Sequence, residues 1–175
     1  MKSLTKVMQT ESEQQDIVVQ IAKNVHQIEM CPAGLEKLVR ATCRRFGVSK
    51  ATVSIALLDD SEIRELNKRF LNRDYATDCL SFDLSDDGDS RTEEKGPVSS
   101  DKFGRSFEVV VNAEMAVREA CARGHSSEAE VALYITHGLL HNLGFDDSAP
   151  DKAKEMHDTE DEILGQLGYG PIESS

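Results

Sequence analysis

The segment that constrains the fold most combines two histidines, a glycine and two aspartates. It reads His137-Gly138-Leu139-Leu140-His141-Asn142-Leu143-Gly144-Phe145-Asp146-Asp147. Two histidines four residues apart lie on one face of a helix, about 5–6 Å apart at Cβ, so their imidazoles can converge on one ion. A glycine after the helix permits a sharp turn. The segment therefore predicts a largely apolar helix that ends in a turn and carries a candidate metal site.

We predict that His137, His141 and Asp147 are the metal ligands. Two imidazoles and one carboxylate suit zinc, one ion per chain, and leave a fourth position for water; nickel or another divalent ion is the alternative. A bound divalent ion can lower the pKa of that water toward about 7 and polarise a phosphoryl or carbonyl oxygen. Burying two imidazoles without partners is costly, which favours ligands over core histidines. His125 reads as a local hydrogen-bonding residue, and His157 is a weak candidate for an extra ligand.

The charge balance excludes several classes of protein. Lysine and arginine number 20 and aspartate and glutamate 32, so the net charge is −12. This net charge argues against a protein whose whole surface binds nucleic acid or an anionic membrane. It does not exclude a local basic groove. The longest uncharged stretch, residues 131–145, is too short and too polar to span a bilayer. We see no signal peptide, and the four scattered cysteines are typical of reduced thiols, so we expect a cytoplasmic protein without membrane contact.

The hydrophobic patterns predict strands interspersed among helices, with at least one hairpin. This order indicates either an α+β fold or a mixed α/β sheet. Ser127 and Glu130 have the spacing of a capping box that would begin the histidine-bearing helix. The expected strands are 17–19, 51–58, 79–84 and 107–111, and the expected helices are 32–46, from 61 onward, 113–123, 128–142 and 150–167.

We expect one domain over residues 16–168, because a chain of 175 residues normally forms a single domain. Residues 1–15 are predicted to be a flexible N-terminal tail, and residues 169–175 a C-terminal tail. Within the domain, residues 85–103 are acidic and rich in glycine and serine, which predicts an exposed loop.

Two blocks of the chain resemble the YbeY endoribonucleases, the bacterial rRNA maturation factor family. Residues 137–146 are similar to that family's H-G-x-L-H-L-x-G-Y-D-H signature. Residues 66–82 are similar to its L-N-x-x-Y/F-R-x-x-D-x-P-T-D-V-L-S-F block, and 124–126 match its G-H-S. The chain departs from the family at four places: Asp147 stands where the family has a third histidine, Leu71 where it has arginine, Ala76 where it has proline, and Phe107-Glu108 where it has G-D before a strand.

The resemblance implies a small α+β fold, with a mixed sheet flanked by helices and a metal-binding helix at a cleft. It implies a metal-dependent endoribonuclease specific for single-stranded RNA, acting in rRNA maturation at the 3′ end of the small-subunit 16S rRNA and in ribosome quality control. Precursor rRNA, the ribosome and small-subunit proteins are the implied partners. The ion would act through His137, His141 and Asp147, with Asp146 and Asp78 as candidates to orient water or neighbouring groups.

A basic segment supports an RNA groove despite the acidic total. Residues 37–73 hold nine lysines and arginines against four acidic residues, a net charge of +5 that leaves −17 to the rest of the chain. Charge separated in this way can focus a phosphate backbone into one groove. The predicted RNA-binding residues are Arg73, Arg69, Lys68, Arg44 and Arg40.

Two alternative functions stay open. The first is a non-catalytic ribosome-assembly protein whose metal is structural. The second is a metalloprotease, because the spacing of His137, His141, Gly144 and Asp147 is also that of metzincin proteases. Those proteases need a glutamate directly after the first histidine as general base. Gly138 occupies that position, which disfavours proteolysis.

Overall fold

The computed structural model describes residues 16–25, 28–85, 104–170 and 172. Strands and helices fall where the hydrophobic patterns place them, with ends shifted by a few residues at most. The elements are β1 (Ile17–Lys23), α1 (Pro32–Arg45), β2 (Ala51–Leu58), α2 (Asp60–Leu71), β3 (Cys79–Asp83), β4 (Arg105–Asn112), α3 (Ala113–Arg123), α4 (Ser127–Asn142) and α5 (Pro150–Gln166).

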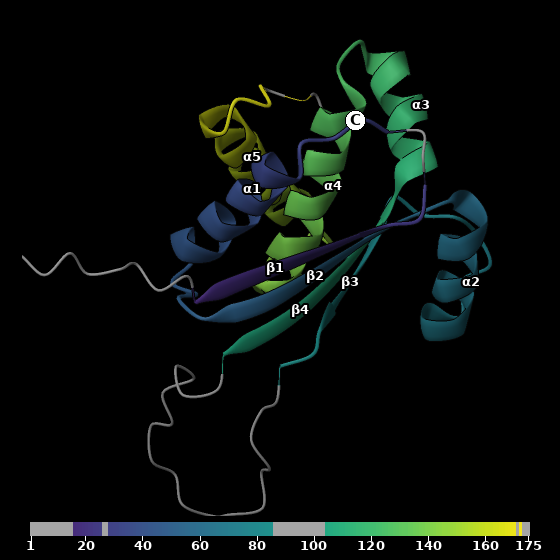
Figure 1. Ribbon diagram of the computed structural model, residues 1–175. Helices are drawn as coiled ribbons and strands as arrows, with labels where there is room; N and C mark the ends of the chain where they lie inside the picture. Colours follow the sequence, from purple (N-terminus) through teal and green to yellow (C-terminus); the bar gives the residue numbers. More distant parts are fainter. Residues whose placement is uncertain (1–15, 26–27, 86–103, 171, 173–175) are drawn as a thin grey trace, which may run out of the picture.

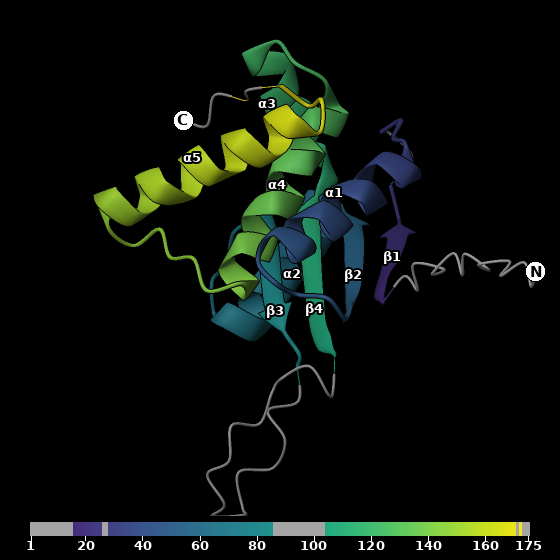
Figure 2. The ribbon, with the colours of Figure 1, turned by 90° about the vertical axis from the view of Figure 1, so that its left-hand side faces the viewer.

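The four strands form one mixed sheet in the order β1-β2-β4-β3. β1, β2 and β4 are mutually parallel, and β3 pairs with β4 in the antiparallel sense. The predicted mixed sheet with a hairpin is therefore confirmed. β1 and β3 are the two edge strands, and the view in Figure 2 shows both edges.

The two faces of the sheet are covered unequally. Val53, Ile55 and Leu57 of β2 belong to the main core, which α1, α4 and α5 share. Ala56 and Leu58, on the opposite face, belong to a smaller cluster with α2. Figure 1 shows α1, α4 and α5 gathered on one side of the sheet, with α2 apart from them. Because strand side chains alternate between faces, the sheet separates the surroundings of α4 from those of α2.

Helix α4 is the most buried helix, as its apolar sequence predicts, with the core on nearly all sides. Its cap differs from the prediction. Ser126, and not Ser127, is the N-cap, and its hydroxyl accepts a hydrogen bond from the Ala129 amide at 3.1 Å. The predicted capping box is absent because, with Ser126 as the N-cap, the third residue of the helix is Ala129 and not Glu130; the buried Glu130 pairs with His125 and Arg123 instead.

Most of the residues that we predict to form tails and a loop lie outside the described part of the chain. The N-terminal tail, 1–15, and residues 86–103 of the acidic loop lie outside the described residues. At the other end the chain continues into the core past residue 168. Ile172 is buried, and Tyr169 packs against the core. Their apolar side chains therefore belong to the folded unit, although we expected a tail from residue 169.

Candidate metal centre and cavity

Helix α4 and the turn after it bring the three predicted ligands together. His137 and His141 lie one turn apart, with their Nε2 atoms 3.1 Å apart and their rings nearly perpendicular, at 87°. Gly144 then adopts a φ of +99°, which favours glycine, and the chain reverses. Asp147 Oδ2 lies 3.8 Å from His137 Nε2 and 3.7 Å from His141 Nε2. These three side chains could hold a metal ion.

Both imidazoles are oriented by a partner on the opposite ring nitrogen. His137 Nδ1 donates to Oε1 of Glu160 at 2.7 Å, and His141 Nδ1 donates to the Phe145 carbonyl at 3.2 Å. Each bond places the proton on Nδ1 and leaves the Nε2 lone pair free to face the centre. Metal-binding histidines normally have such partners, which fix the tautomer and raise ligand basicity. The donor set and its orientation therefore fit a divalent ion.

Glu160 is the residue that sequence reasoning missed. It lies on α5 and is 1% exposed. The available signal was its place in the apolar stripe of α5, one turn after Met156 and just before Ile163. A glutamate rarely occupies such a position unless its carboxylate has a partner. Here that partner is His137.

The electrostatics of the centre are dominated by carboxylates. Burial lowers the pKa of His137, but the hydrogen bond and charge of Glu160, with the charges of Asp78 and Asp147, outweigh burial and raise it. Burial, together with the charges of Asp78, Glu160 and Asp147, raises the pKa of the nearby Cys79 thiol well above its ordinary value. A neutral thiol is a poor ligand, because the thiolate is the metal-binding form. The site therefore offers negative potential without a thiolate. All four cysteines are free.

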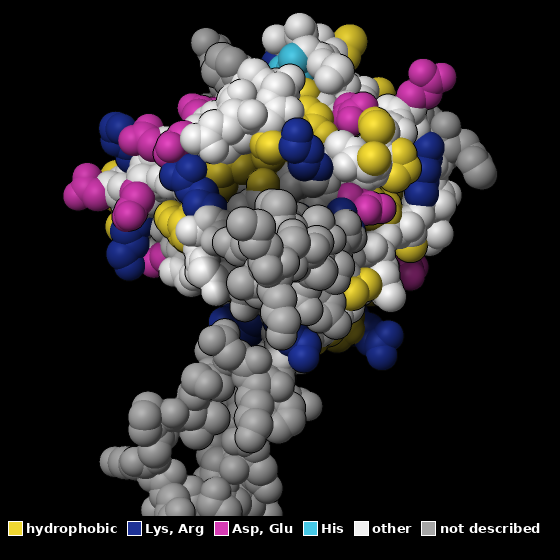
Figure 3. All heavy atoms as spheres, turned by 60° about the vertical axis from the view of Figure 1, so that its left-hand side comes forward, with side chains coloured by type: hydrophobic (Ala, Val, Ile, Leu, Met, Phe, Trp, Pro, Cys, Tyr) yellow, Lys and Arg dark blue, Asp and Glu magenta, His cyan; other side chains and the backbone are white. Residues whose placement is uncertain are grey.

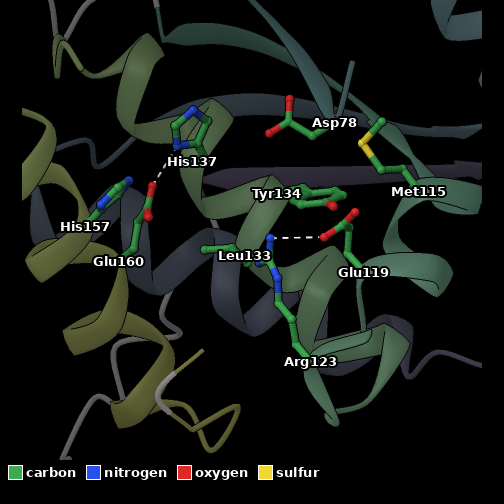
Figure 4. A pocket seen from close by; sticks show the side chains of 9 residues that line it. All are labelled: Asp78, Met115, Glu119, Arg123, Leu133, Tyr134, His137, His157 and Glu160. Carbon is green, nitrogen blue, oxygen red and sulfur yellow. Dashed lines mark hydrogen bonds and ion pairs between the residues drawn. The ribbon is translucent and has the colours of Figure 1, made fainter. Parts of the chain in front are cut away.

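A cavity of about 340 Å³ adjoins the centre between α3, α4 and α5. Figure 4 shows His137 and Glu160 at one end and Asp78 across from them, with the Glu119–Arg123 ion pair farther along. His157 lines the cavity but is not part of the three-residue group. The lining residues are Asp78, Met115, Glu119, Arg123, Leu133, Tyr134, His137, His157 and Glu160.

The other two candidate acids lie in different surroundings. Asp78 is part of the cavity wall, and its Oδ1 accepts hydrogen bonds from the Thr77 hydroxyl and the Cys79 amide. Asp146 is turned to Ser148 and Lys152, whose hydrogen bonds hold its pKa well below the usual range. The structure thus places Asp78 beside the centre and holds Asp146 in the turn that presents Asp147.

His125 is a local hydrogen-bonding residue, as predicted. Its Nε2 pairs with Glu130 Oε2, and Arg123 lies 3.3 Å from the other oxygen of the same carboxylate. Burial and the charge of Glu130 raise the pKa of Tyr134 strongly, which keeps its hydroxyl neutral at the cavity wall. This network joins the end of α3 to the first turn of α4 and so supports one wall of the cavity.

Gly138 packs where no side chain fits. A Cβ atom at this position would lie 2.8 Å from Val109 Cγ1 and 3.5 Å from Ser81 Cβ. Helix α4 therefore approaches β4 and β3 closely just after the first histidine. A Cβ atom at position 138 would be directed toward β4 and β3, and the glycine present there offers no side chain that could act as a general base.

The predicted RNA-binding cations do not form one groove. Arg40 and Arg44 lie on α1, on the main-core side of the sheet, and Arg40 is held by Glu36 and the Ile17 carbonyl. Lys68, Arg69 and Arg73 lie at the end of α2, on the other side. Over the face seen in Figure 3, basic and acidic side chains are interspersed. The basic residues that are concentrated in segment 37–73 of the sequence therefore do not form one basic surface among the described residues.

Comparison with known proteins shows which family the chain resembles. The family model described as Endoribonuclease YbeY matches residues 8–168. The chain is 33% identical over 137 residues to a Bacillus licheniformis protein named endoribonuclease YbeY, which covers 78% of this chain and 85% of that protein. A protein of the same name from Caldanaerobacter subterraneus is 33% identical, covering 81% of this chain and 93% of that one.

A solved structure shows the same fold. The solution structure of a Thermotoga maritima protein matches with a TM-score of 0.53 and 20% identity, covering 90% of this chain and 97% of that chain. At this level of identity the match concerns the fold, and it supports the α+β architecture. None of the helices that the structure describes is long and apolar enough to cross a membrane.

Proposed function

The chain belongs to the YbeY endoribonuclease family, and we propose that it is a metal-dependent endoribonuclease acting on single-stranded RNA. The observation that carries this proposal is the convergence of His137, His141 and Asp147, with both imidazoles oriented by partners on Nδ1. Residues 16–168 would form the catalytic domain.

Zinc is the ion we propose, one per chain, with nickel or another divalent ion as the alternative. Two imidazoles and a carboxylate are the donor set of many catalytic zinc sites. When bound, the ion would lower the pKa of a water toward about 7 and polarise a phosphoryl oxygen. His137, His141 and Asp147 would hold it.

The remaining residues have supporting parts in this proposal. Glu160 keeps the His137 proton on Nδ1, and the Phe145 carbonyl does the same for His141, so both Nε2 atoms face the centre. Asp78, across the cavity from His137, would orient the attacking water or accept its proton. Asp146 would hold the turn, because its oxygens accept hydrogen bonds from Ser148 and Lys152.

The geometry favours hydrolysis over the two alternatives. Structural zinc sites are closed by four protein ligands, whereas catalytic sites have three and an open position. The group found among the described residues has three members, and Asp147 is 44% exposed at its side chain. A metalloprotease would need a base at position 138, where a Cβ atom would collide with Val109.

We propose precursor ribosomal RNA as the physiological substrate, cleaved near the 3′ end of 16S rRNA, with a part in ribosome quality control. The resemblance of residues 66–82 and 137–146 to the family blocks supports this. The ribosome or small-subunit proteins would be its partners, and the cytoplasm, where bacterial ribosomes mature, its location. Lys68, Arg69 and Arg73 are the cations we propose on the RNA path, with Arg40 and Arg44 contributing from the other side of the sheet.

A cleavage assay on a labelled, unstructured RNA tests the proposal. The purified protein should cut the RNA, lose cleavage after treatment with a chelator, and regain it when zinc is returned. His141→Ala should be inactive under all three conditions. Lys154→Ala, on the exposed side of α5, is the control and should cut like the wild type. Cleavage that persists unchanged in chelator and in His141→Ala would contradict the proposal.

A further inference from the structure

Exposed apolar side chains are concentrated at the end of α2. Five large hydrophobic residues are more than a third exposed in the described chain, and three of them lie within six residues. We call these three, Phe70, Leu71 and Tyr75, the aromatic patch; their exposed fractions are 56%, 48% and 53%. The other two are Val18, on the opposite edge strand, and Leu84.

The ring of Phe70 is held in place although it is exposed. It meets the ring of Phe82, on β3, edge to face at 5.4 Å between centroids. The guanidinium carbon of Arg69 lies 5.5 Å from the Phe70 centroid. Phe82 thus fixes the ring from the β3 side, and a cation lies beside the ring. An aromatic ring fixed in this way loses little entropy when another flat group stacks on it.

The backbone that carries Tyr75 is also fixed. The buried Asn67 donates from Nδ2 to the Tyr75 carbonyl at 2.9 Å. Asn72 closes α2 in the left-handed conformation, with φ of 56°. Asp74 then folds back to pair with Arg64 and Lys68. The loop is therefore held against α2 while the Tyr75 side chain stays exposed.

The aromatic patch lies close to the metal centre along the chain. Asp78, which lines the cavity beside His137, follows Tyr75 by three residues. Three residues span at most about 11 Å, so Tyr75 is within that distance of the cavity wall. A strand of RNA whose phosphate lay at the centre could therefore reach the patch with neighbouring nucleotides.

The charge around the aromatic patch is opposite to that of the whole chain. Residues 64–75 carry four lysines and arginines against two acidic residues, in a chain of net charge −12. Arg69 and Arg73 flank the three apolar residues in sequence. Aromatic rings interleaved with cations are the pattern that binds single-stranded nucleic acid, because bases stack on the rings and phosphates pair with the cations.

We propose that the aromatic patch is a stacking site for bases of single-stranded RNA, with Phe70 and Tyr75 as its rings, linked to the metal centre on the other face of the sheet by residues 75–78 beside the edge strand β3. This inference rests on the proposed function, because it takes RNA as the ligand. The close alternation of rings and cations favours RNA over a protein partner, whose docking surface would be a more continuous apolar area. Leu71 supplies an exposed apolar contact between the two rings in sequence.

The test is equilibrium binding of a fluorescent, unstructured RNA of about 12 nucleotides to the full chain in chelator, so that binding is read without cleavage. Tyr75→Ala and Phe70→Ala should each weaken binding by about 5- to 150-fold, the range found for loss of one base–aromatic stack. Neither change removes a charge, so the salt dependence of binding should keep its slope. Tyr75→Phe should bind like the wild type, because the ring is retained.

Two further variants make the result decisive. Phe70→Leu preserves apolar packing on Phe82 while removing the ring, so it should also bind weakly if stacking matters. Val18→Ala removes a similarly exposed apolar group from the opposite edge and should bind normally. Binding by Tyr75→Ala and Phe70→Leu within twofold of the wild type would overturn the proposal and leave the patch as a protein-docking surface.

The outcome also separates this inference from the proposed function. If the wild type cuts RNA with metal but the aromatic variants bind as well as the wild type, only the stacking site is wrong. If the wild type binds RNA through the rings but does not cut it with metal, only the proposed function is wrong. Absence of any binding to single-stranded RNA by the wild type would overturn both.

Discussion

The metal centre and the aromatic patch lie on opposite faces of the sheet and differ in how their side chains are held. At the centre, each imidazole has a dedicated hydrogen-bond partner, and Glu160, behind His137, is almost fully buried. At the patch, Phe82 holds the Phe70 ring and Asn67 holds the Tyr75 backbone, but the side chains of Phe70 and Tyr75 are half exposed. The difference indicates that the centre depends on the orientation of individual ligand atoms, whereas the patch offers exposed ring faces to a ligand. Substitutions at the centre should therefore change metal binding and cleavage, whereas substitutions at the patch should change RNA binding and leave the metal content unchanged.

Among the residues that surround the centre, Glu160 should have the largest effect apart from the ligands themselves. Glu160→Ala removes the acceptor of the His137 Nδ1 proton, so His137 loses its fixed tautomer and orientation. Metal affinity, measured by competition with a chromogenic chelator, should fall by about 10- to 100-fold. Glu160→Gln keeps an acceptor without the charge and should lose less. Equal affinity in all three proteins would mean that the centre does not depend on its buried support.

Gly138 tests the packing beneath the centre. Gly138→Ala places a Cβ atom 2.8 Å from Val109, between α4 and β4. Overpacking of this kind costs about 1–3 kcal/mol of unfolding free energy. Leu71→Ala, in the exposed patch, is the matched control and should change stability by about 0.5 kcal/mol or less. Chemical denaturation of both variants measures the two values. Equal losses would remove the contrast between the two regions.

Asp147 should determine which metal ions the three ligands prefer, because it is the only carboxylate among them. Asp147→His replaces a carboxylate by an imidazole, which removes one negative charge and favours softer ions. We expect the variant to retain metal and to prefer zinc or nickel over manganese more strongly than the wild type does. Competition titrations measure this preference. An unchanged preference would show that Asp147 does not contact the ion.

The smallest effect is expected at Arg73, on the patch side. Arg73→Ala should weaken RNA binding and reduce the slope of the log–log salt dependence by about 0.7, the value for one phosphate contact with a single strand. Metal content should be unchanged, because Arg73 is not among the three residues that converge at the centre. A slope equal to that of the wild type would exclude a phosphate contact at Arg73.

The order of the elements and the three converging residues could be predicted from the sequence, because both depend on local periodicity. Alternation identified β2 to the residue, and the i, i+4 spacing placed both histidines on one face. Glu160 could not be assigned to His137, because its partner is 23 residues away and the contact depends on how α5 packs on α4. The capping box was misplaced because two serines are adjacent, and the hydroxyl of Ser126 rather than Ser127 caps the helix at the Ala129 amide.

The predicted RNA groove shows a second limit of sequence reasoning. The net charge of residues 37–73 adds together cations of α1 and α2. In the structure these two helices lie on opposite sides of the sheet. The exposure of the patch rings could not be predicted from the sequence either, because Phe70 continues the apolar face of α2. Only the tertiary packing shows that its ring remains half exposed.

The most direct test of the central claim is the metal content of the purified protein, measured by mass spectrometry after reconstitution with zinc and dialysis. We predict close to one ion per chain in the wild type and almost none in His141→Ala, with both proteins folded by circular dichroism. A wild type that stays metal-free, or an equal metal content in His141→Ala, would contradict a centre formed by His137, His141 and Asp147.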